Sequence, residues 1–283
     1  MQNYINGLQY IPASLTKKDI QEIACPSYER LIIDPEHPSY RDACEHFSQT
    51  KYKYPYLPLY LGNHDIPNVE KIDLNVLRLL IRMNNSEASI YLPMQLLPLK
   101  ELILCTINYH RQAYSANKDC FVYLTVRACT FEQLYYKNSM GWHIDGFQGS
   151  RIERHIIEQD AFWCNLSATQ FLLQPMFCEG LNPTKHDINM FFDNQADSRF
   201  MVQSLEKSIY LATPYNIHRV NPNPFDGKRV FVRINFSPVL IEDHTNTFNP
   251  EFPEYKFKPR VDVRDFLWQY NACEVSDSGF IFA

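Results

Sequence analysis

Glycine is scarce in this chain, and that scarcity limits the folds it can adopt. Only 8 of the 283 residues are Gly, whereas 18 are Pro, 19 are Phe and 18 are Tyr. So few glycines argue against a Gly-rich phosphate-binding fold. Abundant aromatic residues and prolines instead favour strands joined by rigid, Pro-marked loops. The composition therefore predicts a β-rich protein.

Signals for secretion and membrane insertion are also missing. Residues 1–7 contain neither the basic nor the apolar region of a secretory signal. No run approaches the roughly 20 apolar residues that a membrane helix needs. The eight cysteines are scattered without a Cys-x-x-Cys pair, so we expect neither a zinc site nor a disulfide framework. These features predict a cytoplasmic protein with reduced thiols and no membrane partner.

The charge balance and the length set further limits. The formal net charge of −5 lacks the basic excess typical of nucleic-acid-binding proteins, so no nucleic-acid partner is expected. The sequence shows no repeat, low-complexity segment or linker. We expect a single domain over 1–283, with a mixed helical support region at 1–118, a β core at about 119–240 and a C-terminal extension at 241–283. The oligomeric state is left open.

Apolar periodicity predicts the individual elements. Helical spacing predicts an amphipathic helix over 69–83 and a second helix beginning near Pro98. Short helices are expected from Thr16 and within 39–47 and 262–270, and residues 184–200 are expected to be irregular or helical. The predicted strands cover 121–129, 161–166, 171–176, 208–212 and 229–237. Several short strands with flanking helices indicate an α+β protein, mainly β, with a sandwich or jelly-roll core.

A His-x-Asp tripeptide at His143 and Asp145 is the first candidate for chemistry. On a strand, residues separated by one position point to the same face, so an imidazole and a carboxylate would project side by side. A second histidine, His218, follows the apolar run at 208–212. Two His and one carboxylate with open coordination positions form the facial triad of non-haem Fe(II) enzymes. The tripeptide alone is a weak signal, so its context decides.

Two arginines after His218 supply part of that context. Arg229 and Arg233 lie on the clearest predicted strand at an even spacing, so they share a face. Arg binds carboxylates in a bidentate manner, and a buried Arg needs an anionic partner. No acidic residue alternates with these two on their strand, and a bound dicarboxylate would supply the partner. The other candidate distal histidines are followed by no such Arg (His110, His155, His186).

The order His143-x-Asp145, His218 and then Arg resembles the 2-oxoglutarate- and Fe(II)-dependent oxygenase superfamily over about residues 120–240. The resemblance implies a double-stranded β-helix (cupin-like jelly roll) with His143, Asp145 and His218 as catalytic iron ligands. It also implies 2-oxoglutarate and O2 as co-substrates. Arg233-Ile234-Asn235 is similar to the family's Arg-x-Ser form with Asn in place of Ser, whereas Arg229 has the spacing of some members. The motif favours Arg233 slightly as the 2-oxoglutarate ligand.

The resemblance further implies hydroxylation or desaturation, because a small residue in place of Asp145 would be needed to admit a halide. We expect a small-molecule substrate, such as an amino acid or carboxylate metabolite. The alternatives are a protein or peptide hydroxylase, a cupin-type metalloenzyme without 2-oxoglutarate, and a jelly-roll binding protein without catalysis. Further candidates for the pocket or for polar contacts are Trp142, Phe147, Tyr123, Arg127, Asn165, Thr169, Gln170, Gln174 and Asn216.

Overall fold

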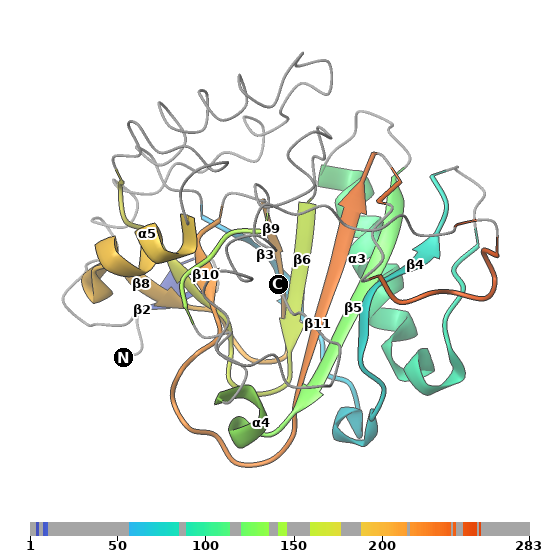
Figure 1. Ribbon diagram of the computed structural model, residues 1–283, viewed down its shortest axis with the longest axis horizontal. Helices are drawn as coiled ribbons and strands as arrows, with labels where there is room; N and C mark the ends of the chain where they lie inside the picture. Colours follow the sequence, from blue (N-terminus) through green and yellow to red (C-terminus); the bar gives the residue numbers. More distant parts are fainter. Residues whose placement is uncertain are drawn as a thin grey trace, which may run out of the picture.

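Two antiparallel β-sheets form the framework of the described chain (Figure 1). The computed structural model describes residues 4–5, 8–10, 57–84, 89–113, 120–135, 141–145, 159–176, 188–213, 216–238, 240–241, 246–253 and 255. The larger sheet has six strands in the order β3 (Leu59–Asn63), β9 (Ser208–Ala212), β6 (Gln159–Cys164), β11 (Arg229–Ser237), β5 (Phe121–Cys129) and β4 (Val76–Arg82). The smaller sheet has five in the order β1 (Tyr4–Ile5), β2 (Leu8–Tyr10), β8 (Met201–Gln203), β7 (Gln170–Leu172) and β10 (His218–Arg219). The predicted β-rich fold with flanking helices is confirmed at this level.

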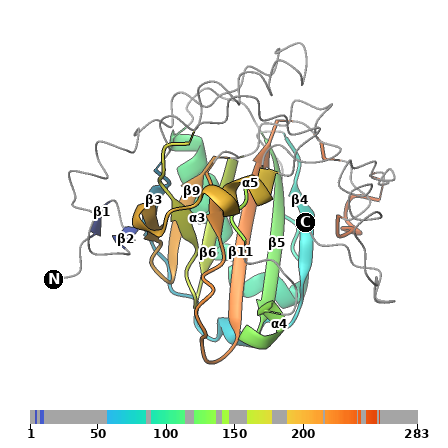
Figure 2. The ribbon, with the colours of Figure 1, turned by 60° about the vertical axis from the view of Figure 1, so that its left-hand side comes forward.

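Short helices flank the sheets. They are η2 (Val69–Lys71), η3 (Met94–Leu99), α3 (Lys100–Ala113), α4 (Phe131–Tyr135), α5 (Ile188–Gln195) and η5 (Ser198–Phe200). Figures 1 and 2 show α3 along one face of the large sheet. Among the described residues, no helix has the length and apolar character needed to cross a bilayer.

Strand β11 separates the hydrophobic core from the site. Its residues Val230, Val232 and Ile234 are buried in one cluster with the apolar face of α3. Because side chains alternate along a strand, Arg229, Phe231, Arg233 and Asn235 lie on the opposite face. There Phe231 packs on a cluster that includes residues of the small sheet. Both arginines therefore face the space between the two sheets, as the sequence predicts.

The predicted helix over 69–83 is wrong. Only η2 is helical there, and residues 76–82 form β4, which pairs with β5. Leu79 and Ile81 are buried in the core with α3, whereas Leu80 is buried in a second cluster on the other face. A strand covered on both faces reads as a near-continuous apolar run and hides its period of two. A register shift between Val76 and Leu79, with Arg78 at φ 45°, disturbs the period further.

Most other predicted elements are confirmed. The helix predicted near Pro98 is present as η3 and α3, and its predicted apolar stripe is buried (Leu99, Leu102, Ile103, Ile107). Strands 121–129, 208–212 and 229–237 have the predicted bounds. The strand predicted at 161–166 begins and ends two residues earlier, as β6, and the one predicted at 171–176 is shorter, as β7. Within 184–200, the described part contains α5 and η5. The helices expected from Thr16 and within 39–47 and 262–270, and the candidate Phe147, lie outside the described residues.

Candidate metal centre

The backbones of His143 and His218 form an isolated antiparallel bridge at the edge of the small sheet. Each residue donates its N–H to the other's carbonyl oxygen, and both N–O distances are 2.9 Å. Residues paired in this way project their side chains to the same face. Their ring centroids are 4.4 Å apart. Strand pairing thus brings together two histidines that are distant in the sequence.

Both imidazole rings are oriented by backbone carbonyl oxygens. Nδ1 of His143 lies 2.9 Å from the oxygen of Gly141, and Nδ1 of His218 lies 2.9 Å from the oxygen of Asn216. A carbonyl oxygen only accepts hydrogen bonds, so Nδ1 carries the proton in each ring. When such a ring is neutral, its Nε2 has an available lone pair. A hydrogen bond of this kind on the second nitrogen is the usual support of a metal-ligating histidine.

Asp145 completes the cluster. One ligand atom from each of His143, Asp145 and His218 lies within 4.8 Å of the others. Oδ2 of Asp145 is 3.5 Å from Nε2 of His218. The side chains of Asp145 and His218 are only 13% and 7% exposed. The three residues that carry the resemblance to 2-oxoglutarate/Fe(II) oxygenases thus lie together in the structure, in a group that could hold a metal ion.

Arg233 holds the second carboxylate oxygen of Asp145. Its Nη1 lies 2.6 Å from Oδ1, and its side chain is 12% exposed. Burial raises the pKa of Asp145. The charge of Arg233, the charges that His218 and His143 carry when they are protonated in acid, and the hydrogen bond from Arg233 more than offset this and hold that pKa well below its usual range. Asp145 is therefore ionised at neutral pH.

Burial, together with the neighbouring His143, lowers the pKa of His218 to about 4, against the opposing charge of Asp145. The ring is thus neutral at neutral pH. The proton on Nδ1 leaves the lone pair of Nε2 directed toward the carboxylate of Asp145. Two electron-pair donors then face one another across 3.5 Å. A cation bound between them would relieve this repulsion.

Aromatic side chains pack against His218. The ring centroid of Phe162 lies 5.0 Å from that of His218, and the centroid of Phe171 lies 6.1 Å away. Phe162 also packs on Phe231. The interior between the sheets is therefore apolar beside the cluster, which strengthens electrostatic interactions there.

Arg229 occupies a different position from Arg233. Arg229 is 2% exposed, and its Nε donates a hydrogen bond to the backbone carbonyl oxygen of Ser167 at 3.0 Å. Its Nη2 has no hydrogen-bond partner among the described residues. Burial raises the pKa of the adjacent Cys164 thiol, so that thiol stays neutral and does not balance the guanidinium charge. Arg229 is thus a buried cation for which the described residues supply no anion.

Arg127 adds a third guanidinium to the same region. It lies opposite Phe231 across the β5–β11 pair, so the two side chains share the interior face. Burial and the charge of Arg233 lower the pKa of Arg127 to about 10, so it remains protonated at neutral pH. Positive charge therefore accumulates on this part of the large sheet.

Several candidate polar residues have structural roles instead. The side chain of Asn165 accepts a hydrogen bond from the backbone N–H of Val230 and donates one to the backbone carbonyl oxygen of Lys228. Gln174 bonds the backbone of Gln195 and Asp197. Gln170 bonds the side chains of Arg219 and Asn221. The other candidates are buried in strands or turns (Tyr123, Thr169, Asn216).

Trp142 is also placed away from the interior. It precedes His143 on an extended segment, so its ring projects to the opposite side, where it stacks on the guanidinium of Arg219 at 4.2 Å. Sequence reasoning missed Asp160, whose carboxylate accepts a hydrogen bond from Asn235 on the interior face of the large sheet. Only the strand register, which pairs these two residues, reveals this contact.

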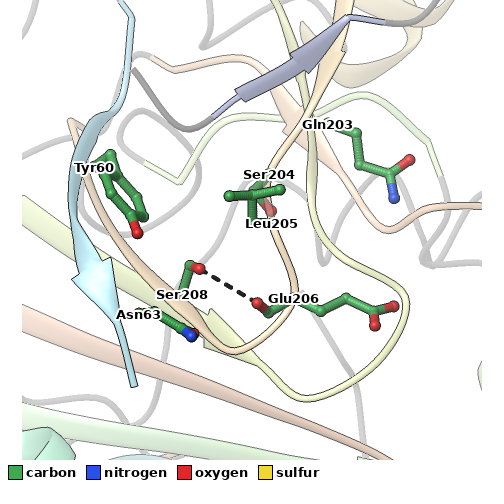
Figure 3. Close-up of a pocket in the computed structure, with 7 residues that line it drawn as sticks. All are labelled: Tyr60, Asn63, Gln203, Ser204, Leu205, Glu206 and Ser208. Carbon is green, nitrogen blue, oxygen red and sulfur yellow. Dashed lines mark hydrogen bonds between the residues drawn. The ribbon is translucent and has the colours of Figure 1, made fainter. Parts of the chain in front are cut away.

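The described residues also form a cavity of about 450 Å³ away from the cluster (Figure 3). Tyr60, Asn63, Gln203, Ser204, Leu205, Glu206 and Ser208 line it. There the hydroxyl of Ser208 donates a hydrogen bond to the backbone carbonyl oxygen of Glu206 at 3.2 Å. Neither the His143 cluster nor the arginines line this cavity. Reactivity depends on the ligand chemistry of a site more than on its volume, so we place the candidate site at His143, Asp145 and His218.

Comparisons with known proteins give limited similarity. No protein-family model and no curated protein match the sequence. Among solved structures, EvdMO1 is similar at a TM-score of 0.32 and 16% identity, over 69% of this chain and 42% of EvdMO1. The chain thus spans less than half the length of that protein. HygX from Streptomyces hygroscopicus, with nickel and 2-oxoglutarate bound, is similar at a TM-score of 0.34 and 10% identity, over 92% of this chain and 94% of HygX. Function must be argued from the site itself.

Proposed function

We propose that this protein is an Fe(II)- and 2-oxoglutarate-dependent dioxygenase that hydroxylates or desaturates a small molecule. One observation carries the proposal. Two histidines with their Nε2 lone pairs available and one ionised carboxylate converge within 4.8 Å in a largely buried site. The second nitrogen of each histidine is already held by a backbone carbonyl. This donor set, with positions left open, is the one that suits non-haem Fe(II).

The residues fit the metal in a defined way. His143 and His218 would bind through Nε2, and Asp145 would bind through Oδ2, because Arg233 holds its Oδ1. A carboxylate held in this manner acts as a single ligand and leaves room for co-substrate. The bound metal would supply the activation of O2 with 2-oxoglutarate that side chains cannot supply. Because Asp145 occupies a ligand position, hydroxylation or desaturation is favoured over halogenation.

Arg229 is the better candidate for the far carboxylate of 2-oxoglutarate. The Arg-x-Asn motif favours Arg233, but Arg233 already has Asp145 as its partner. Arg229 is nearly fully buried and its Nη2 lacks a partner among the described residues. A buried guanidinium is costly without an anion, and a carboxylate suits it in bidentate geometry. Arg127, on the same interior face, would add to the attraction for an anionic co-substrate.

The strand order supports a double-stranded β-helix as the core. In chain order, β5, β6, β9 and β11 belong to the large sheet, while the His143 segment, β7, β8 and β10 belong to the small sheet or extend it. The chain thus passes repeatedly between two facing sheets, as a jelly roll does. The proposed ligands and arginines all lie on elements that face the space between them.

Side chains of this protein would perform three tasks. His143, Asp145 and His218 would hold the metal, and Arg229 would hold the co-substrate. Phe162, Phe171 and Phe231 would exclude water from the space beside them. The low exposure of Asp145 and His218 favours a substrate small enough to enter an enclosed site over a protein or peptide.

The first test is thermal unfolding without oxygen, with Mn(II), 2-oxoglutarate, or both. A ligand at about 100 times its dissociation constant adds roughly 2.7 kcal/mol of stability. We expect the largest shift with both ligands together, and no Mn(II)-dependent shift in His143→Ala or Asp145→Ala. Metal-dependent succinate formation should vanish in both variants while their circular dichroism is preserved.

Other outcomes select the alternatives. A full shift with Mn(II) alone, unaffected by 2-oxoglutarate, would indicate a cupin-type metalloenzyme. No shift in any condition would indicate a binding protein in which the cluster is incidental. Hydroxylation of peptides but not of small metabolites would indicate a protein hydroxylase.

A further inference from the structure

Helix α5 contacts the segment that carries His143 and Asp145 through one side chain. Oδ1 of Asp193 accepts a hydrogen bond from the backbone N–H of Trp142 at 2.7 Å. A Cβ at Gly141 would lie 2.5 Å from Oδ2 of the same carboxylate, closer than real Cβ contacts occur. The Asp193 carboxylate thus lies directly on the backbone of residues 141 and 142. A side chain at position 141 would therefore have to displace this carboxylate.

The contacted residues lead directly to the His143 ring. Gly141 supplies the carbonyl oxygen that orients Nδ1 of His143. Trp142 is the last residue before the backbone bridge between His143 and His218. A displacement of residues 141 and 142 would therefore move both the carbonyl that orients the ring and the start of the bridge.

A second contact lies on the outer side of the bridge. Residues 142 and 219 each adjoin a bridge histidine, and adjacent strand residues point to opposite faces. The guanidinium of Arg219 lies 4.2 Å from the ring centroid of Trp142, and its Nε donates to Gln170 Oε1 at 2.8 Å. The histidines therefore face the interior while Trp142 and Arg219 pack together behind them. Asp193 fixes the Trp142 backbone in this arrangement.

We propose that Asp193 is a positioning residue for His143 and Asp145 that acts through the backbone of Gly141 and Trp142. The inference rests on the proposed metal site. Asp193 is itself exposed, and its carboxylate touches none of the proposed ligand side chains. Its effect would be to hold the ligand segment in the position that metal binding requires. Losing an outer support of this kind typically weakens metal binding about 10- to 100-fold.

The test compares Mn(II) dissociation constants, measured by the electron paramagnetic resonance signal of free Mn(II), in matched variants. Asp193→Ala removes the acceptor, and we expect Mn(II) binding to weaken at least about 10-fold. Asp193→Asn keeps an acceptor oxygen and should restore binding to within about threefold of the wild type. Asn194→Ala, at an exposed position on the same helix, is the control and should bind as the wild type does. The absorption spectrum of bound Co(II) reports ligand geometry, and it should change in Asp193→Ala but not in Asp193→Asn.

Gly141→Ala provides a second route that does not alter the carboxylate. Its added Cβ would displace Asp193, so it should weaken Mn(II) binding as Asp193→Ala does. Wild-type affinity and an unchanged Co(II) spectrum in Asp193→Ala would overturn this inference and leave the proposed function intact. If the wild type failed to bind Mn(II), the proposed function itself would fail, and this inference with it. His143→Ala sets the level of lost binding for comparison.

Discussion

Arg233 and Asp145 form an ion pair that joins the two sheets, with 2.6 Å between Nη1 and Oδ1. Arg233 lies on the central part of β11, whereas Asp145 follows the bridge at the edge of the small sheet. The pair keeps the carboxylate ionised in a buried setting and fixes which of its oxygens is available. An arginine that the sequence motif favours for the co-substrate thus serves the proposed metal ligand instead.

Arg233→Gln should make metal binding more sensitive to acid. Burial raises the pKa of Asp145, and the charge of Arg233 is the first of the effects that lower it. Without Arg233 the pKa of Asp145 rises, so protons compete with the metal as the pH falls. At pH 7.5 we expect a small change in the Mn(II) dissociation constant, because the carboxylate is still ionised and a repelling cation has been removed. At pH 5 the loss relative to the wild type should be clearly larger than at pH 7.5, because protons compete with the metal more strongly as the pH approaches the raised pKa of Asp145.

The measurement is Mn(II) affinity between pH 5 and 8. Arg199→Gln is the control, because Arg199 is exposed and pairs with Asp197 away from the cluster. Parallel pH profiles for wild type and Arg233→Gln would show that the ion pair does not control the charge of Asp145.

Arg229→Gln should separate co-substrate binding from metal binding. Arg229 is buried, and its Nη2 lacks a hydrogen-bond partner among the described residues. Its guanidinium is therefore suited to bind an anionic group of a ligand. Truncating one member of a buried charge pair costs about 2–5 kcal/mol. We therefore expect 2-oxoglutarate affinity, measured by calorimetry with Mn(II) present, to fall at least about 30-fold. Mn(II) affinity should be unchanged.

Lys228→Gln is the matched control, since Lys228 precedes Arg229 but pairs with exposed Asp73. If 2-oxoglutarate binding instead disappeared in Arg233→Gln at pH 7.5 and survived in Arg229→Gln, the assignment of the two arginines would be reversed.

The sequence predicts which candidate residues lie together better than it predicts their neighbours. His143, Asp145 and His218 are identified by residue type and order, and strand alternation correctly places Arg229 and Arg233 on one face. Strand β11 is predicted at its observed bounds because its face toward α3 is apolar and its face toward the small sheet contains polar residues. These are local patterns with a period of two, which a sequence displays directly.

Long-range pairing is what the sequence does not display. The partner of Arg233 comes from another sheet, so the expectation that a ligand must supply its anion fails for Arg233. The contact of Asp193 with Trp142 depends on where helix α5 packs, and the contact of Asn235 with Asp160 depends on strand register. The sequence of strand β4 predicts a helix because both of its faces are buried and a register shift interrupts its period of two.

Asn235→Ala should destabilise the fold. Asn235 and Asp160 are both fully buried, and Nδ2 of Asn235 donates to the carboxylate of Asp160. Removing the donor deprives a buried carboxylate of a hydrogen bond, which costs about 1–3 kcal/mol or more for a charged group. Urea unfolding monitored by circular dichroism should show this loss as a lower midpoint with an unchanged slope. The exposed Asn223→Ala should stay within about 0.5 kcal/mol of the wild type.

The pH dependence of stability should include a contribution from His110, which is not part of the proposed metal site. Burial lowers the pKa of His110 to about 4, and its ring stacks on Phe236 with centroids 3.8 Å apart. The unfolded chain protonates this histidine near its ordinary pKa of about 6.5. Between these values the unfolded state binds more protons than the folded state. Stability therefore falls as the pH drops from 6.5 to 4, by on the order of 3 kcal/mol from this residue.

The measurement for His110 is urea unfolding at intervals from pH 7 to pH 4. His110→Gln removes the titrating group, so its free energy of unfolding should change less steeply with pH than that of the wild type. His64→Gln is the comparison, because the described hydrogen bonds of His64 are made by its backbone and survive the substitution. We expect His64→Gln to follow the wild-type profile. Equal slopes for His110→Gln and wild type would mean that His110 takes up its proton in the folded state as readily as in the unfolded chain.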